Sequence, residues 1–466
     1  MVAALRAELR MPKLQSPIRL WPGRRLQNCC WRQEPERVIS VAFSLPEVMS
    51  LLSLLRSRIA TVALLVAGVW SGGLSLGHAQ KWVLLTEVPD YTWYAGCFGT
   101  ASGNLMGFWD RHGLPDLYTG NAGGGVAPLE TFSAANKDVR SMWASKAGVD
   151  GRPANLPGHI DDYWNNYRSD TDYSYEDTSP DPYVTLHRPE HAPDCIGDFI
   201  GLSQRKWTNM AGECDGNVDA FSFVYWDKSG RRRSNYTSTN TTGELTPDIQ
   251  SGLRAWSRSR GYEADVFTQL SSFNSERTSS AGFTFADVKA EIDSGYPVLC
   301  FLQPPGEYSR NLGGSMTRGN PEIHGVLIYG YIEDPAHGIT DSVVIRTSWG
   351  SGDNQIQPWS NLNWLGLYPV RGVIGYHPKP KVRTFTRGNG SISLSWDGPS
   401  AYLMDMYAPP GTEARALHRY QVEASRSLTN PSWQAVGATT TERSITVPDC
   451  CEDFPFFRVQ LLPPSQ

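Results

Sequence analysis

The chain carries no excess of positive charge. Its 466 residues have a net charge of −5, and because the first 80 carry +6, the remainder carries −11. A protein that binds nucleic acid needs a basic surface to face the phosphates. We therefore expect no nucleic-acid partner.

Residue patterns that hold metals or phosphates are also missing. The histidines and cysteines show no zinc-ligand spacing. The triple glycine at 123–125 lacks the lysine of a phosphate-binding loop and its strand-to-helix context. We expect no metal and no cofactor.

The apolar run Ile59–Trp70 is shorter than the roughly 20 residues that a membrane-spanning helix needs. Arg56 and Arg58 precede it, and small residues follow it up to Ala79. This three-part layout predicts a signal peptide over 49–80 and a secreted, periplasmic or extracellular protein. Membrane association is expected only if this signal stays uncleaved.

Residues 1–48 lie upstream of the predicted signal. They are rich in arginine and show no periodic apolar pattern. A signal should begin at the N-terminus, so Met49 is a candidate for the true start. We interpret 1–48 as a disordered upstream extension outside the fold.

Cysteine is scarce past residue 80, where six of the eight remain. Disulfides persist in secreted proteins. Cys195 and Cys214 are the best pair, because they are close in sequence within a loop-like stretch. The adjacent Cys450-Cys451 either bridge each other or pair elsewhere. Cys300 is expected to be a buried strand residue, which leaves Cys97 without an obvious partner.

Two regions follow the signal. Residues 81–378 are expected to form one unit of mixed helix and strand, in which 283–303 is a capped helix that runs into a buried strand. A Pro/Lys-rich stretch then separates this unit from 382–466, where short alternating strands such as SISLSW are divided by turn signals. That pattern is typical of a small β-sandwich.

The C-terminal region resembles the fibronectin type III-like modules of bacterial secreted proteins. The likeness lies in the stretches SLTNPSWQAV and FFRV. It implies a spacer or adhesion module that contacts a cell surface or an extracellular matrix.

Cys97 lies where a helix is expected to begin. A thiol attacks as the thiolate, which a helix N-terminus stabilises, and main-chain N–H groups there can bind an oxyanion. The partner base must come from elsewhere in the fold. His324 is the best candidate, because it opens an apolar strand and is followed by Gly325. The alternative is a buried histidine bonded to a main-chain carbonyl.

The stretch VPDYTWYAGCFGTASGNLMGFWDRHG resembles the nucleophile segment of papain-like cysteine peptidases, in the branch of bacteriocin-processing (double-glycine) peptidases. His324-Gly325 before an apolar strand resembles the same branch, as does Ser348-Trp349-Gly350 at the end of a later strand. The likeness covers roughly 87–376. It implies an α+β papain-like fold, followed by the small all-β sandwich, and thiol-dependent hydrolysis.

Two positions depart from that family. Thr347 stands where an Asn or Asp orients the histidine, and its hydroxyl carries no charge to stabilise imidazolium. Asp341 or Asp353 could take over that role in space. Tyr91 stands where the family has a glutamine that donates to the oxyanion, a role open to its O–H or to the Trp93 N–H.

The resemblance predicts a peptide or protein substrate. His324 would deprotonate Cys97, Thr347 would orient the imidazole, and Tyr91 would help to hold the oxyanion. One alternative is a catalytically inactive papain-like scaffold that serves as an extracellular binding or adhesion module. Transglutaminase-like acyl transfer uses similar residues and is a third possibility.

Overall fold

A computed structural model describes residues 80–92, 97–118, 125–133, 135–136, 196–200, 227–236, 249–272, 278–302, 324–348, 350, 355–359, 370–409, 411, 414–449 and 453–462. The predicted extension at 1–48 and the predicted signal up to residue 79 lie outside these residues. So do Cys195, Cys214, Cys450 and Cys451. The predictions made for all of them stay predictions.

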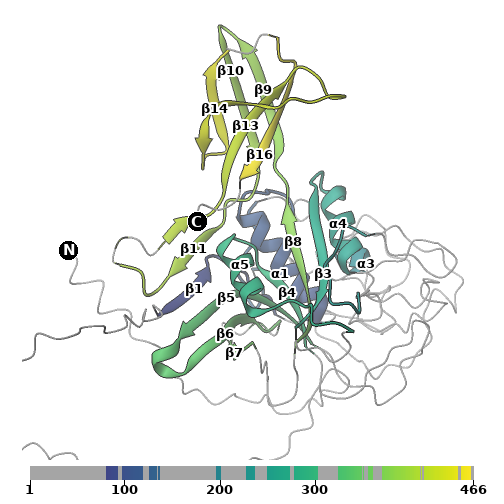
Figure 1. The fold of residues 1–466 in the computed structure, drawn as a ribbon, viewed down its shortest axis with the longest axis vertical. Coiled ribbons are helices and arrows are strands. Elements are labelled where there is room, and N and C mark those ends of the chain that lie inside the picture. The colour runs from purple at the N-terminus through teal and green to yellow at the C-terminus, as the bar shows by residue number, and fades with distance from the viewer. Residues whose placement is uncertain are drawn as a thin grey trace, which may run out of the picture. The chain divides into compact units, whose positions relative to one another are not determined.

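A ten-stranded antiparallel sheet forms the largest element of the fold (Figure 1). Its continuous order is β12-β11-β1-β5-β4-β8-β3-β2, and β6 and β7 extend it beside β5. The strands are β1 (Lys81–Leu85), β2 (Arg233–Ser234), β3 (Ala264–Leu270), β4 (Val298–Leu302), β5 (His324–Asp334), β6 (Ile339–Arg346), β7 (Gln355–Pro358), β8 (Val370–Pro378), β11 (Tyr402–Asp405) and β12 (Ala414–Ala416).

The strand β5 organises this sheet. Its first half pairs with β4, its second half pairs with β1, and β6 runs along its other edge. The sequence HGVLIYGYIED is rich in β-branched and aromatic residues, which favour strand, and all but one of its residues are buried. His324 is therefore the first residue of the strand at the centre of the sheet.

Four α-helices lie within the described residues: α1 (Cys97–Arg111), α3 (Ile196–Ile200), α4 (Ile249–Ser259) and α5 (Phe285–Asp293). A one-turn 3-10 helix, Pro335–His337, links β5 to β6. The helix α1 packs against β5 and β4. None of the helices in the described ranges has the length and apolar character needed to span a membrane.

The predicted helix and buried strand within 283–303 are confirmed as α5 and β4. Thr284 and Asp287 form a reciprocal capping box at the start of α5. Gly295 follows the helix with φ +87, a left-handed conformation that suits glycine. Cys300 is buried in β4 with a free thiol, as the apolar run YPVLCFL predicts.

The predicted papain-like α+β class is wrong. The described residues are mostly strand, arranged in three antiparallel sheets with few helices. The resemblance rested on short motifs around Cys97, His324 and 348–350, and such motifs do not determine how distant strands pair. The apolar runs between them are rich in β-branched and aromatic residues and add strand after strand to one sheet.

Two three-stranded sheets follow in the C-terminal region, with the orders β15-β10-β9 and β14-β13-β16. Their strands are β9 (Lys381–Gly388), β10 (Ser391–Asp397), β13 (Arg419–Ser425), β14 (Gln434–Thr440), β15 (Ser444–Pro448) and β16 (Phe456–Leu462). The alternating apolar residues of SISLSW are buried: Ile392, Leu394 and Trp396. They share a core with Tyr420 and Val422. The two sheets therefore enclose one apolar core.

Strands β11 and β12 come from within the predicted sandwich range, yet they extend the large sheet. Val83 of β1 pairs with Asp405 of β11, and Leu403 pairs with Arg415 of β12. The residues after 382 therefore contribute to both sheet systems. The predicted boundary near 376–384, as a site of cleavage between two folded pieces, stays a prediction.

Candidate functional site

The helix α1 begins at Cys97, as the sequence predicts. The first N–H groups of a helix have no partner within it, and they form its positive end. No acidic residue lies in the first turn to neutralise that end. The side chain of Cys97 lies outside the described part of the structure, so its surroundings follow from the residues beside it.

The contact between Phe98 and Gly325 joins the start of α1 to the start of β5. A Cβ at position 325 would lie 2.5 Å from Phe98 Cδ1. The Phe98 ring also stacks on Phe301 of β4, with ring centroids 4.7 Å apart. Because Phe98 follows Cys97 and Gly325 follows His324, the Phe98 ring brings the start of α1 near the start of β5.

His324 is 4% exposed, and its ring is held by a main-chain group. Its Nε2 lies 2.7 Å from the carbonyl oxygen of Thr347. A carbonyl only accepts hydrogen bonds, so Nε2 carries the proton in the neutral ring. The lone pair of that tautomer is on Nδ1, which makes Nδ1 the basic atom of the ring.

Thr347 therefore contacts the predicted base through its main-chain carbonyl. The residue directly follows β6. Ser348 then adopts φ +66, and its hydroxyl donates to the carbonyl of Gly325 at 2.9 Å. This second bond fixes the end of β6 beside the start of β5. The orienting role predicted for the Thr347 hydroxyl stays a prediction, and the contact described here is made by the carbonyl.

Burial keeps His324 neutral. Loss of contact with water lowers the pKa of the imidazole to about 4, and the hydrogen bond to the Thr347 carbonyl opposes this only in part. An imidazole with that pKa is unprotonated at neutral pH. It can accept a proton there.

The Tyr91 hydroxyl is directed to a different place from the one predicted. It donates to the carbonyl of Pro128 at 2.9 Å and packs against Gly107. Gly107 lies ten residues beyond Cys97 in α1, about 15 Å along the helix. Burial raises the pKa of Tyr91 far above its usual value. The Tyr91 hydroxyl therefore lies far along α1 from Cys97.

Besides the start of α1 and the start of β5, the main chain at Tyr91 and Thr92 also lies beside the site. Asn104 of α1 accepts the Tyr91 N–H at 2.9 Å, and Thr131 accepts the Thr92 N–H at 3.0 Å. A Cβ at Gly350 would lie 2.5 Å from Thr92 Cα. The segment that enters Cys97 therefore packs against the segment that leaves Thr347.

An ion pair supports this arrangement and was not predicted. Arg346, the last residue of β6, lies 3.7 Å from the Asp90 carboxylate and donates to the carbonyl of Val88 at 2.8 Å. It ties the strand that ends before Thr347 to the segment before Cys97. The sequence offers no signal for it, because the two partners are more than 250 residues apart.

Of the other candidate side chains, Asp341 alone lies within the described residues. Asp341 lies six residues before Thr347 on β6, about 20 Å away along the strand, while Asp353 and Trp93 lie outside the described residues. Among the described residues, no group of histidine, cysteine and carboxylate side chains could hold a metal ion.

Comparison with protein-family models, with curated proteins and with solved structures finds no match to this chain. The chemistry of the site is therefore inferred from its own residues. Three features define it: a helix N-terminus at Cys97, a buried neutral imidazole at His324, and a main-chain acceptor at Thr347 that fixes the tautomer.

Proposed function

We propose that the chain is a thiol-dependent hydrolase of a peptide bond or a related amide, with Cys97 as the nucleophile and His324 as the general base. The observation that carries the proposal is the bond from His324 Nε2 to the Thr347 carbonyl, next to the start of α1. It supports a ring in which Nδ1 is the basic atom. The contact of Phe98 with Gly325 supports the proximity of the two residues.

Acylation follows from these roles. Nδ1 of His324 takes the proton of the Cys97 thiol as the sulfur bonds to the substrate carbonyl carbon. The carbonyl π electrons move to the oxygen, which accepts hydrogen bonds from N–H groups at the start of α1. The oxyanion then collapses and breaks the C–N bond, while Nδ1–H protonates the leaving amine.

Deacylation repeats the sequence with water. Nδ1 takes a proton from water as the oxygen attacks the thioester carbon, and it returns a proton to the departing sulfur. One amide and one water give one carboxylic acid and one amine. The proton on Nε2 stays there throughout and is donated in the hydrogen bond to the Thr347 carbonyl, which holds the ring in one tautomer.

The neutral state of His324 favours a general-base route over a preformed thiolate–imidazolium pair. An unperturbed thiol has a pKa of about 8.5, and the pKa of His324 is about 4. Proton transfer between them at rest would cost about 6 kcal/mol. The helix N-terminus and the attraction between the thiolate and the imidazolium both reduce this cost. The remainder favours proton transfer that accompanies the attack on the substrate.

Location and partners belong to the same proposal. The segment at 49–80 supports secretion, with a mature N-terminus near Gln80, and sequencing of exported protein tests it. The charge of −11 beyond residue 80 speaks against a nucleic-acid partner, and the peptide or protein substrate rests on the motifs around Cys97 and His324. The C-terminal sheets are proposed to contact a cell surface or an extracellular matrix.

The test combines labelling with turnover. Iodoacetamide is applied to the purified mature protein and the modified cysteines are mapped by mass spectrometry, while a pool of internally quenched peptides reports cleavage. We expect labelling at Cys97 and loss of cleavage in parallel. Cys300 is the internal control, because burial raises the pKa of its thiol and it should stay unlabelled.

Matched variants separate the possible outcomes. Cys97→Ala and His324→Gln should each abolish turnover while circular dichroism and the melting temperature show a folded protein. Absence of any turnover, with Cys97 unreactive, would mean an inactive binding or adhesion protein and would refute the proposal. Incorporation of a primary amine into the peptides in place of cleavage would indicate acyl transfer instead of hydrolysis.

A further inference from the structure

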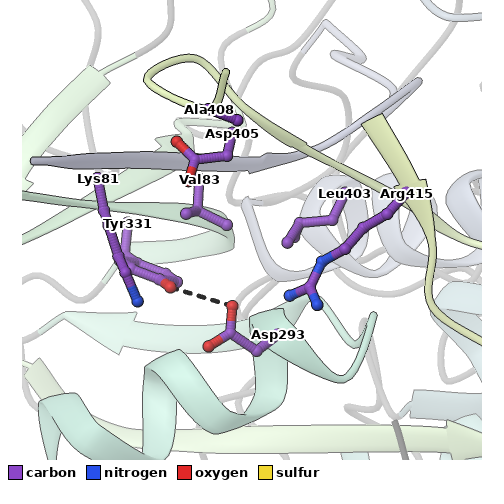
Figure 2. A pocket seen from close by; sticks show the side chains of 8 residues that line it. All are labelled: Lys81, Val83, Asp293, Tyr331, Leu403, Asp405, Ala408 and Arg415. Carbon is purple, nitrogen blue, oxygen red and sulfur yellow. Dashed lines mark hydrogen bonds between the residues drawn. The ribbon is translucent and has the colours of Figure 1, made fainter. Parts of the chain in front are cut away.

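A cavity of about 170 Å³ lies at the other end of β5 from His324. Its lining residues come from β1, β5, α5 and the β11–β12 region, and Figure 2 shows them facing a common space: Lys81, Val83, Asp293, Tyr331, Leu403, Asp405, Ala408 and Arg415. Tyr331 lies seven residues beyond His324 in β5, about 23 Å along the strand. The cavity is therefore separate from the proposed active site.

Charges of both signs face this cavity without pairing directly. Lys81 and Arg415 both act on the Asp293 carboxylate from a distance, but no ion pair among the described residues joins either cation to it. Figure 2 shows the Arg415 guanidinium and the Lys81 ammonium on either side of Asp293. A cavity lined by separated positive and negative side chains is suited to a ligand that carries charge.

The negative charge of Asp293 lies in an unfavourable position when no such ligand is bound. It is the last residue of α5, where the carbonyl end of the helix already carries partial negative charge. Burial raises the pKa of this carboxyl, although the Tyr331 hydroxyl donates to it at 3.0 Å. A ligand ammonium would neutralise both the carboxylate and the helix end.

The remaining lining residues define the other features of the ligand. Arg415 and Lys81 are exposed cations at the rim of the cavity, and arginine is well shaped to bind a carboxylate through two parallel hydrogen bonds. Val83 and Leu403 are buried and apolar. The carboxylate of Asp405 in the same lining disfavours a simple anion, just as the two cations disfavour a simple amine.

We propose that this cavity binds a free α-amino acid with a small apolar side chain. The ammonium group contacts Asp293, the carboxylate contacts Arg415 and Lys81, and the side chain lies against Val83 and Leu403. The ligand touches residues from β1 and α5 on one side and from β11 and β12 on the other. Binding therefore stabilises the attachment of β11 and β12 to the large sheet.

Three probes of matched shape test the proposal by isothermal titration with the full mature chain: L-leucine, 4-methylpentanoate, which lacks the ammonium group, and 3-methylbutylamine, which lacks the carboxylate. We expect leucine to bind and to raise the melting temperature. Each analogue should bind about tenfold more weakly or worse, because it loses one charge-assisted hydrogen-bonded group. Equal binding of either analogue would overturn the assignment of a dipolar ligand.

Variants locate the binding. Asp293→Asn should weaken leucine by about tenfold or more but should not weaken 4-methylpentanoate, and Arg415→Gln should weaken both. Asp453→Asn and Arg426→Gln are the controls, since they alter an exposed ion pair that does not line the cavity. Arg415 is exposed on a short edge strand, so this variant tests the site even if Asp293→Asn fails to fold. No binding of leucine at 10 mM, or full binding by Arg415→Gln, would refute the proposal.

Discussion

The substitution Gly325→Ala tests how the start of α1 is held next to His324. The added methyl group would lie 2.5 Å from Phe98 Cδ1, 2.9 Å from Cε1 and 3.0 Å from Cγ. Carbon atoms in contact normally lie about 3.5–4.0 Å apart. The Phe98 ring must therefore retreat by about 1 Å, and Phe301, stacked at 4.7 Å, restricts where it can go.

Two effects of known size follow. Insertion of a methyl group into a well-packed core costs about 1–3 kcal/mol of unfolding free energy. Phe98 is bonded to Cys97, so a shift of the ring also moves the proposed nucleophile relative to the base. A misplacement of about 1 Å costs roughly 100-fold in rate. We therefore expect a loss of about 100-fold in kcat/KM from a protein that remains folded at 25 °C.

The assay measures peptide turnover per mole of folded protein, and urea denaturation curves give the folded fraction of each variant. Gly330→Ala is the matched control, because Gly330 lies on the same strand as Gly325, about 16 Å away. Its added methyl group would lie 2.5 Å from Leu84 Cδ2 of β1. It should lower stability without lowering kcat/KM. Phe98→Leu combined with Gly325→Ala should restore part of the activity, since the smaller side chain relieves the overlap.

The outcome that contradicts this reasoning is specific. If Gly325→Ala loses stability as Gly330→Ala does but keeps wild-type kcat/KM, then the contact between Phe98 and Gly325 is only structural. Additive effects of Phe98→Leu and Gly325→Ala on kcat/KM would lead to the same conclusion, because coupled positions should deviate from additivity.

Three further predictions address other parts of the molecule. Thr347→Ala retains the carbonyl that binds His324, so kcat/KM should stay within about threefold, whereas His324→Gln should abolish turnover. The unfolding free energy should fall as pH drops from 6.5 towards 4, because burial lowers the pKa of native His324 to about 4 and that of His418 to about 3. Both histidines take up protons in the unfolded chain over this range, and each contributes up to about 1.4 kcal/mol per pH unit. Urea melts of His418→Gln should show a shallower pH dependence of the unfolding free energy. Cys195 and Cys214 should appear as one cross-linked peptide in non-reducing mapping, and reduction should cost roughly 3 kcal/mol of stability.

Local features of the fold could be predicted from the sequence. The helix that starts at Cys97, the buried strand around Cys300 and the strand that His324 opens all follow from short apolar patterns with clear ends. Gly107 in this helix allows the Tyr91 side chain to approach closely. Each of these features depends on residues within about one turn or one strand.

Strand pairing could not be predicted in the same way, and this is why the predicted fold class fails. The order β11-β1-β5-β4 joins segments that are distant in sequence. Nothing in Tyr402–Asp405 itself distinguishes a strand of the large sheet from a strand of the two smaller C-terminal sheets. Alternation of apolar residues predicts a strand with one buried face, but it does not identify the partner.

The orientation of His324 depends on an atom that every residue possesses. The family resemblance predicts an Asn or Asp at position 347, and the threonine there offers a hydroxyl without charge. The group that accepts from Nε2 is the carbonyl of that residue, which any side chain would leave in place. Its direction is set by the turn at Ser348, with φ +66 and a hydroxyl bonded to Gly325. A neutral carbonyl fixes the tautomer as well as an amide does, but it adds no charge to stabilise imidazolium, which agrees with the low pKa of the ring. The departure from the family pattern at Thr347 therefore argues for a base that stays neutral at rest, and not for the loss of the base.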